Sequence, residues 1–108
     1  MKEELRKASK KLLDEKKKKI IQEIRDQIEL HGGKHQDWYV GITEDPKTRL
    51  AAHNVQKSDK PFIRDCKSEA IARSVEKYCN EKLGCDGAEG GGISPTFVYA
   101  YKKSQTTD

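Results

Sequence analysis

Three side chains that can act on a phosphate occur close together between residues 39 and 53. Tyr39 lies in a short run of aromatic and β-branched residues, and Arg49 and His53 follow ten and fourteen residues later. Residues four apart lie on one face of a helix, so the arginine and the histidine can face the same ligand. A phenol, a guanidinium and an imidazole can orient a phosphate, neutralise it and exchange protons with it. The spacing therefore indicates a phosphate-binding site.

The elements that would position these side chains can be predicted from the same stretch. Residues 37–43 combine aromatic and β-branched residues with polar flanks, which predicts a short strand. Asp45 and Pro46 predict a helix start, because aspartate accepts from free N–H groups and proline suits the first turn, and this helix should run to about Asn54. The strand must turn tightly into the helix, and we expect Gly41 to supply the backbone freedom for that turn.

A candidate carboxylate lies farther along the chain. Ser68 is the expected N-cap of a helix whose apolar residues recur at three-to-four spacing until Gly84 ends it. Glu76 shares a face with apolar positions of this helix, so its carboxylate should border the core, where a charge needs a partner. Glu69, at the start of the helix, is the alternative carboxylate. If neither glutamate is functional, each would simply form an ion pair with a basic side chain on the helix.

Residues 39–53 resemble the second half of the GIY-YIG nuclease core, because a Tyr-Val-Gly run is followed by arginine and histidine at the family's spacing. The resemblance covers about residues 37–83. It implies a small three-stranded antiparallel sheet flanked by helices. It also implies a set of functional side chains: catalytic Tyr39, Arg49 and His53, and a metal-binding Glu76.

The activity that the resemblance implies is metal-dependent phosphodiester hydrolysis, with DNA as the expected substrate and RNA as the alternative. Glu76 would hold one Mg²⁺, or another divalent cation, that polarises the phosphate. Arg49 would neutralise charge that develops on the phosphoryl oxygens. Tyr39 would orient or deprotonate water, and His53 would move that proton or contact the phosphate.

The chain departs from the family at one motif. Residues 31–37 contain no Gly-Ile-Tyr and predict no strand that could pair with the strand of Tyr39. Residues 96–101 give the best strand pattern in the chain, with aromatic residues on one side. We expect this C-terminal strand to fill the vacant sheet position, as in a circular permutation, and to bring catalytic Tyr99, or else Tyr101, near the place of the missing tyrosine.

The remaining segments complete an expected α+β fold. Residues 3–30 carry apolar residues at a period near four and predict an amphipathic helix that a glycine pair ends. The lysine run 16–19 interrupts the apolar stripe. The segment is therefore expected to form either two helices or one long helix whose first half projects from the body. A weak strand pattern surrounds Phe62. The glycine-rich stretch 84–95 predicts a plain connection, because it lacks the ending of a phosphate-binding loop.

Length and composition fit one small domain with a thin core. The chain has 108 residues, of which 33% are hydrophobic and 37% charged. We expect three consecutive parts: an N-terminal amphipathic helix over 1–31, a GIY-YIG-like domain over 34–103, and a polar tail over 104–108.

The excess positive charge gathers near the N-terminus. The net charge is +4, and residues 1–31 hold ten lysine or arginine residues against seven acidic ones. Clustered charge attracts nucleic acid at long range, so this segment would supply most of the attraction for DNA or RNA. The alternatives are a solvated helix face, a helix-mediated homodimer, and a docking face for a protein partner formed by Ile20, Ile24 and Ile28.

The absence of a predicted membrane span or signal peptide and the odd number of cysteines both favour a cytoplasmic protein. No apolar run is long enough for a membrane span and the start lacks the features of a signal peptide, so we expect a cytoplasmic protein with no membrane partner. Cys66, Cys79 and Cys85 are an odd set, which leaves at least one cysteine unpaired. We interpret them as small buried hydrophobic residues rather than zinc ligands. A noncatalytic nucleic-acid-binding module on the same scaffold is the alternative to a nuclease.

Overall fold

The computed structural model describes residues 2–87 and 92–107, with side chains from residue 12 onward. Its main elements are α1 (Lys2–His31), β1 (Trp38–Thr43), α2 (Pro46–Ala52), β2 (Phe62–Asp65), α3 (Glu69–Tyr78) and β3 (Phe97–Lys102). Two short 3₁₀ turns, His35–Asp37 and Lys57–Asp59, and a π-helical turn, Cys79–Leu83, lie between them.

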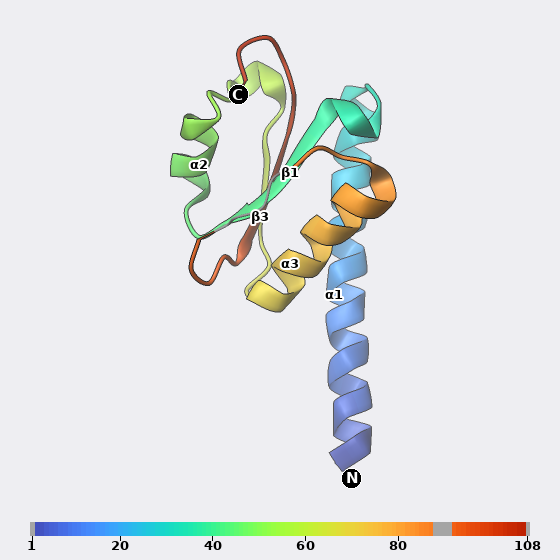
Figure 1. Cartoon of the computed structure of the whole chain (residues 1–108). Coiled ribbons are helices and arrows are strands. Elements are labelled where there is room, and N and C mark those ends of the chain that lie inside the picture. The colour runs from blue at the N-terminus through green and yellow to red at the C-terminus, as the bar shows by residue number, and fades with distance from the viewer. Residues whose placement is uncertain (1, 88–91, 108) are drawn as a thin grey trace.

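The three strands form one antiparallel sheet in the order β1-β3-β2. Figure 1 shows this sheet between α2 on one side and the pair α1 and α3 on the other. The expected α+β fold, a small antiparallel sheet flanked by helices, is therefore confirmed. The C-terminal strand pairs directly with β1, as the sequence predicted, and it occupies the centre of the sheet.

The two faces of the sheet have different roles. On one face, small and β-branched residues of β1 and β3 join the main core beneath α1 and α3: Val40, Ile42, Val98 and Ala100. Successive side chains in a strand point to opposite faces, so the alternate positions face α2. Those positions carry the tyrosines that the sequence singled out.

Helix α1 is continuous through its lysine run, which decides between the two arrangements that the sequence left open. Its second half packs in the core, where Ile24 is fully buried, and its first half extends beyond the body of the molecule (Figure 1). Gly32 ends the helix with a φ of 79° and donates its N–H to the Ile28 carbonyl at 2.8 Å. A positive φ of this size favours glycine.

The alternative in which Ile20, Ile24 and Ile28 form a docking face for a protein partner is wrong. Their exposed fractions are 7%, 0% and 4%, because they pack in the same core as the sheet and α3. An amphipathic stripe indicates that one face of a helix is buried. It does not identify whether the residues that pack against that face belong to the same chain or to a partner.

The helix starts that position the candidate site follow the expected capping chemistry. The Asp45 side chain accepts from the Thr48 N–H at 3.3 Å, and the Ser68 hydroxyl accepts from the Ile71 N–H at 3.3 Å. The last turn of the helix predicted up to residue 83 is π-helical, and Gly84 ends it with a φ of 84°.

All three cysteines are buried, in agreement with the sequence interpretation. Burial raises the pKa of Cys66 to about 11, of Cys79 to about 12 and of Cys85 to about 11. Protonated thiols are poor nucleophiles, and these side chains pack as small apolar groups in the core. Among the helices of the described residues, none is long and apolar enough to cross a membrane.

The burial of α1 leads to a stability prediction. Ile24→Ala should lower the free energy of unfolding by about 2–5 kcal/mol, because it leaves a cavity between α1 and the sheet. Leu30→Ala, on the same helix but 73% exposed, is the matched control and should change it by less than about 0.5 kcal/mol. Urea unfolding followed by circular dichroism measures both. Equal losses would contradict this packing of α1.

Candidate functional site

The pairing of β1 with β3 brings together three tyrosines that lie far apart in the sequence. Tyr39 pairs with Tyr101, and Gly41 pairs with Tyr99. The ring of Tyr39 lies 6.1 Å from the ring of Tyr99 and 5.2 Å from that of Tyr101, measured between centroids. The predicted approach of the C-terminal tyrosines to Tyr39 is therefore confirmed, and both of them belong to the cluster.

Gly41 makes space for this cluster. A Cβ at this position would lie 2.5 Å from the Tyr99 hydroxyl oxygen and 2.6 Å from the ring carbon that carries it. The backbone of Gly41 keeps an ordinary strand conformation within β1, without a positive φ. The expectation that this glycine supplies turn flexibility is therefore wrong, because what the position requires is the absence of a side chain beneath Tyr99.

His53 joins the tyrosines from α2. It follows the last helical residue, and its N–H still bonds to the Arg49 carbonyl at 3.1 Å, so the two side chains remain one turn apart. The His53 Nε2 atom lies 3.3 Å from the Tyr99 hydroxyl oxygen, and its ring centroid lies 4.9 Å from that of Tyr39. The imidazole therefore connects both phenols to α2.

Arg49 lies on the exposed side of α2 and acts on the tyrosines through its charge. The guanidinium lowers the pKa of both Tyr39 and Tyr99, although burial outweighs it in each case. Arg49 also borders a surface cavity of about 380 Å³ at the end of β1 and the start of α2. Glu44 and Asp45 line the same cavity, so an anion would have to bind at the guanidinium itself, on its side toward the phenol groups.

Glu76 lies on α3, half-buried, at the outer edge of β1. Burial raises the pKa of its carboxyl, whereas the charge of Arg73 and a hydrogen bond from the Ile42 backbone N–H lower it. Its negative charge in turn raises the pKa of Tyr39, so the two groups interact electrostatically. Glu69 instead accepts a hydrogen bond from Arg73 at 3.1 Å on the exposed side of α3. Of the two candidate carboxylates, Glu76 is therefore the one coupled to the tyrosine cluster.

The two phenols are held in their protonated forms. Burial raises the pKa of Tyr39 and, more strongly, that of Tyr99, which is only 2% exposed. A hydrogen bond between the two hydroxyls lowers the pKa of Tyr39 and raises that of Tyr99. Tyr39 is more accessible than Tyr99, so Tyr39 is the phenol that can meet a ligand, and Tyr99 orients it.

One member of this site was missed from the sequence. Asp86 forms a short parallel bridge to the free edge of β1: its carbonyl accepts from the Val40 N–H at 2.9 Å, and its N–H donates to the Trp38 carbonyl at 2.8 Å. The Asp86 carboxylate raises the pKa of Tyr39 and pairs with Lys103 at 3.2 Å. The segment falls in the stretch interpreted as a plain connection, of which residues 88–91 lie outside the described part of the chain.

A divalent cation is compatible with the donor chemistry at Glu76. Among the described residues, no group of three histidine, cysteine or acidic side chains is placed to hold a metal ion. Mg²⁺ commonly takes one or two carboxylates and completes its shell with water and phosphate oxygens. Glu76 borders a surface cavity of about 360 Å³, which leaves room for such ligands. The residues present thus fit a substrate-dependent Mg²⁺ rather than a closed protein site.

Comparison with known proteins adds no assignment. Neither a protein-family model, nor a curated protein, nor a solved structure matches this chain.

The space beneath Tyr99 can be tested by a double-mutant cycle. Gly41→Ala should lower the free energy of unfolding by about 1–3 kcal/mol, because its methyl group overpacks the tyrosine ring. In a Tyr99→Ala background the same substitution should cost less than about 0.5 kcal/mol, because the ring is gone. Chemical denaturation of the four proteins gives both values. A cost of Gly41→Ala that does not depend on Tyr99 would contradict this packing.

The tyrosine pKa shifts predict how stability depends on alkaline pH. The unfolded chain releases phenol protons near pH 10, whereas the folded chain retains them to higher pH. The stability that Tyr39 and Tyr99 contribute is therefore complete below about pH 10 and is lost as pH rises through the folded pKa values. Tyr99→Phe should flatten this decline in denaturation measured across the alkaline range. Tyr78→Phe is the control for loss of one hydroxyl, and equal effects of the two substitutions would refute the assignment.

Proposed function

We propose that this chain hydrolyses phosphodiester bonds in nucleic acid, with DNA as the first substrate to test and with Mg²⁺ or another divalent cation as cofactor. One observation carries the proposal. Tyr39 is simultaneously in ring contact with His53, hydrogen-bonded to Tyr99, and within electrostatic reach of Arg49 and Glu76. These groups come from β1, α2, α3 and β3, with Arg49 and Glu76 bordering separate cavities, and groups that perturb one another's pKa values in this way are enriched at functional sites.

The GIY-YIG resemblance gives this convergence a chemical interpretation. Residues 31–37 end α1 and form a 3₁₀ turn, so the first tyrosine strand of that family has no counterpart there. On this proposal, β3 supplies that strand from the other end of the chain, and Tyr99 takes the place of the missing tyrosine. The proposal therefore treats the chain as a circularly permuted core of this type.

Each side chain would have a defined task in hydrolysis. The Arg49 guanidinium binds non-bridging phosphate oxygens and offsets the charge that builds on them. Tyr39, fixed by the Tyr99 hydroxyl, orients the attacking water. The His53 imidazole accepts the proton that this water releases as its oxygen bonds to phosphorus and the bond to the leaving oxygen breaks. Glu76 would hold the cation, which would supply Lewis-acid stabilisation of the phosphate and of the leaving oxygen.

Tyr99 has a positioning role within this scheme. Its side chain is 2% exposed and its hydroxyl lies against Gly41, so it does not meet substrate directly. The same burial favours the second candidate function, a noncatalytic nucleic-acid-binding module in which the tyrosines only support the sheet. The two functions differ in whether a metal-dependent cleavage accompanies binding.

Nicking of supercoiled plasmid DNA tests the proposal. The wild-type chain should nick in Mg²⁺ and not in EDTA. Glu76→Gln and Arg49→Ala should each lower the nicking rate by about 10²–10³-fold, because each removes charge stabilisation at the reacting phosphate. Glu69→Gln, on the same helix, is the matched control and should retain wild-type rates.

Three outcomes separate the alternatives. Nicking that survives Glu76→Gln would show a contaminating nuclease or a different site, and the proposal would fail. Salt-sensitive binding of duplex without any nicking would favour the noncatalytic module. Absence of both behaviours, with a folded chain, would exclude both functions for DNA.

A further inference from the structure

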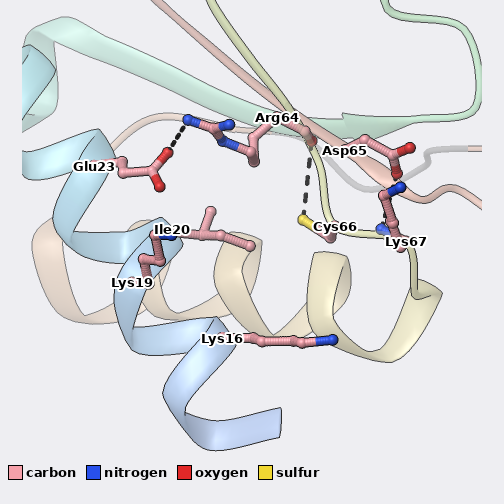
Figure 2. Close-up of a pocket in the computed structure, with 8 residues that line it drawn as sticks. All are labelled: Lys16, Lys19, Ile20, Glu23, Arg64, Asp65, Cys66 and Lys67. Carbon is pink, nitrogen blue, oxygen red and sulfur yellow. Dashed lines mark hydrogen bonds and ion pairs between the residues drawn. The ribbon is translucent and has the colours of Figure 1, made fainter. Parts of the chain in front are cut away.

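A cavity of about 190 Å³ lies between α1, β2 and the segment that leads into α3 (Figure 2). β2 is the edge strand opposite to β1, so this cavity and the Glu76 carboxylate lie at opposite edges of the sheet. Ile20 and Cys66 give it an apolar surface and are themselves buried. Its other lining residues are charged: Lys16, Lys19, Glu23, Arg64, Asp65 and Lys67.

The charges around this cavity do not balance. Four cations face two carboxylates, which leaves an excess of two positive charges. Glu23 forms an ion pair with Arg64, and Asp65 accepts from the Lys67 N–H at 2.8 Å. Figure 2 shows these contacts and shows Lys16 extended across the cavity from α1.

After the Glu23–Arg64 pair, three lysine ammonium groups share the cavity with one carboxylate charge, that of Asp65. Within the described residues, the ion pairs of the structure do not include Lys16, Lys19 or Lys67. Like charges that share one cavity repel each other, and an anion placed between them removes that repulsion. The cavity is therefore matched electrostatically to an anionic group.

We propose that this cavity binds a backbone phosphate of nucleic acid through Lys16, Lys19 and Lys67. Lysine is a flexible point charge that suits phosphate oxygens without requiring a fixed geometry. The apolar lining residues are an isoleucine and a cysteine, so the cavity has no aromatic ring for a base to stack on. The contact would therefore be independent of sequence.

The rest of α1 favours a polyanion over a small anion. Residues 2–19 hold nine lysine or arginine residues against four acidic ones. The helix continues from the cavity into its projecting half, so a chain of phosphates can follow it (Figure 1). The inference extends the proposed function, since it adds a substrate contact, but it can be measured by binding alone.

The test measures binding of a fluorescent DNA duplex in EDTA over a range of salt concentrations. The cavity variant carries Lys16→Gln, Lys19→Gln and Lys67→Gln. The control variant carries Lys34→Gln, Lys57→Gln and Lys82→Gln, which removes the same charge from exposed positions outside both the cavity and α1. Glutamine and lysine have similar helix propensities, so both variants should fold.

The cavity variant should lower the slope of log K against log salt concentration by about 1 for each phosphate contact that it loses, and the control variant should keep the wild-type slope. If the slope changed equally in the two variants, the effect would come from the overall charge of the chain, and the proposal would be overturned. Failure of the wild-type chain to bind duplex, or binding to phosphatidylserine vesicles in its place, would also overturn it.

Nicking assays keep this inference separate from the proposed function. If the cavity variant alone loses affinity while no protein nicks DNA, the phosphate site stands and the nuclease proposal fails. If the wild-type chain nicks DNA and the two variants bind with the same slope, the nuclease proposal stands and the phosphate site fails.

Discussion

The register between β1 and β3 is the constraint on which the candidate site depends. It places Tyr99 above Gly41 and Tyr101 beside Tyr39. Side chains alternate between the two faces of a strand, so a shift of one residue would move the tyrosines of β3 into the core and the core residues toward α2. The main core packs on one face and the tyrosines on the other, so the pairing that stabilises the fold also assembles the site.

Burial then gives the site its electrostatic character. The tyrosine hydroxyls lose water when the sheet forms, and the groups that remain near them are one guanidinium, two carboxylates and an imidazole. Burial raises the pKa of the half-buried Glu76 carboxyl, and Arg73 and the Ile42 N–H offset part of that rise. On the proposed function, a phosphate beside Arg49 and a cation beside Glu76 would add to this arrangement of fixed charges around protonated phenols.

Local spacing in the sequence predicted what short segments determine. The strand at Tyr39, the capped helix that carries Arg49 and the helix that carries Glu76 each follow from patterns within about fifteen residues. The pairing of the C-terminal strand was also predictable, because β1 needed a partner and residues 31–37 could not form one. That inference used the stability of sheets and not a local pattern.

Features that depend on contacts between distant segments could not be predicted. The role of Gly41 is set by Tyr99, which is far along the chain, so the sequence suggested a turn where the structure requires empty space. Asp86 pairs with β1 through a single bridge, which leaves no periodicity to detect. The apolar stripe around Ile24 predicted burial correctly, but it did not decide between a cover from the same chain and one from a partner.

The most direct test of the convergence at Tyr39 is paramagnetic broadening of the amide signals by Mn²⁺, a common substitute for Mg²⁺ at oxygen ligands. If Glu76 holds the cation beside β1, the amide signals of Tyr39 to Ile42 should broaden first, and Glu76→Gln should abolish that effect whereas Glu69→Gln should not. Broadening centred on another part of the chain, or unchanged in Glu76→Gln, would contradict a metal-assisted phosphate site at this edge of the sheet.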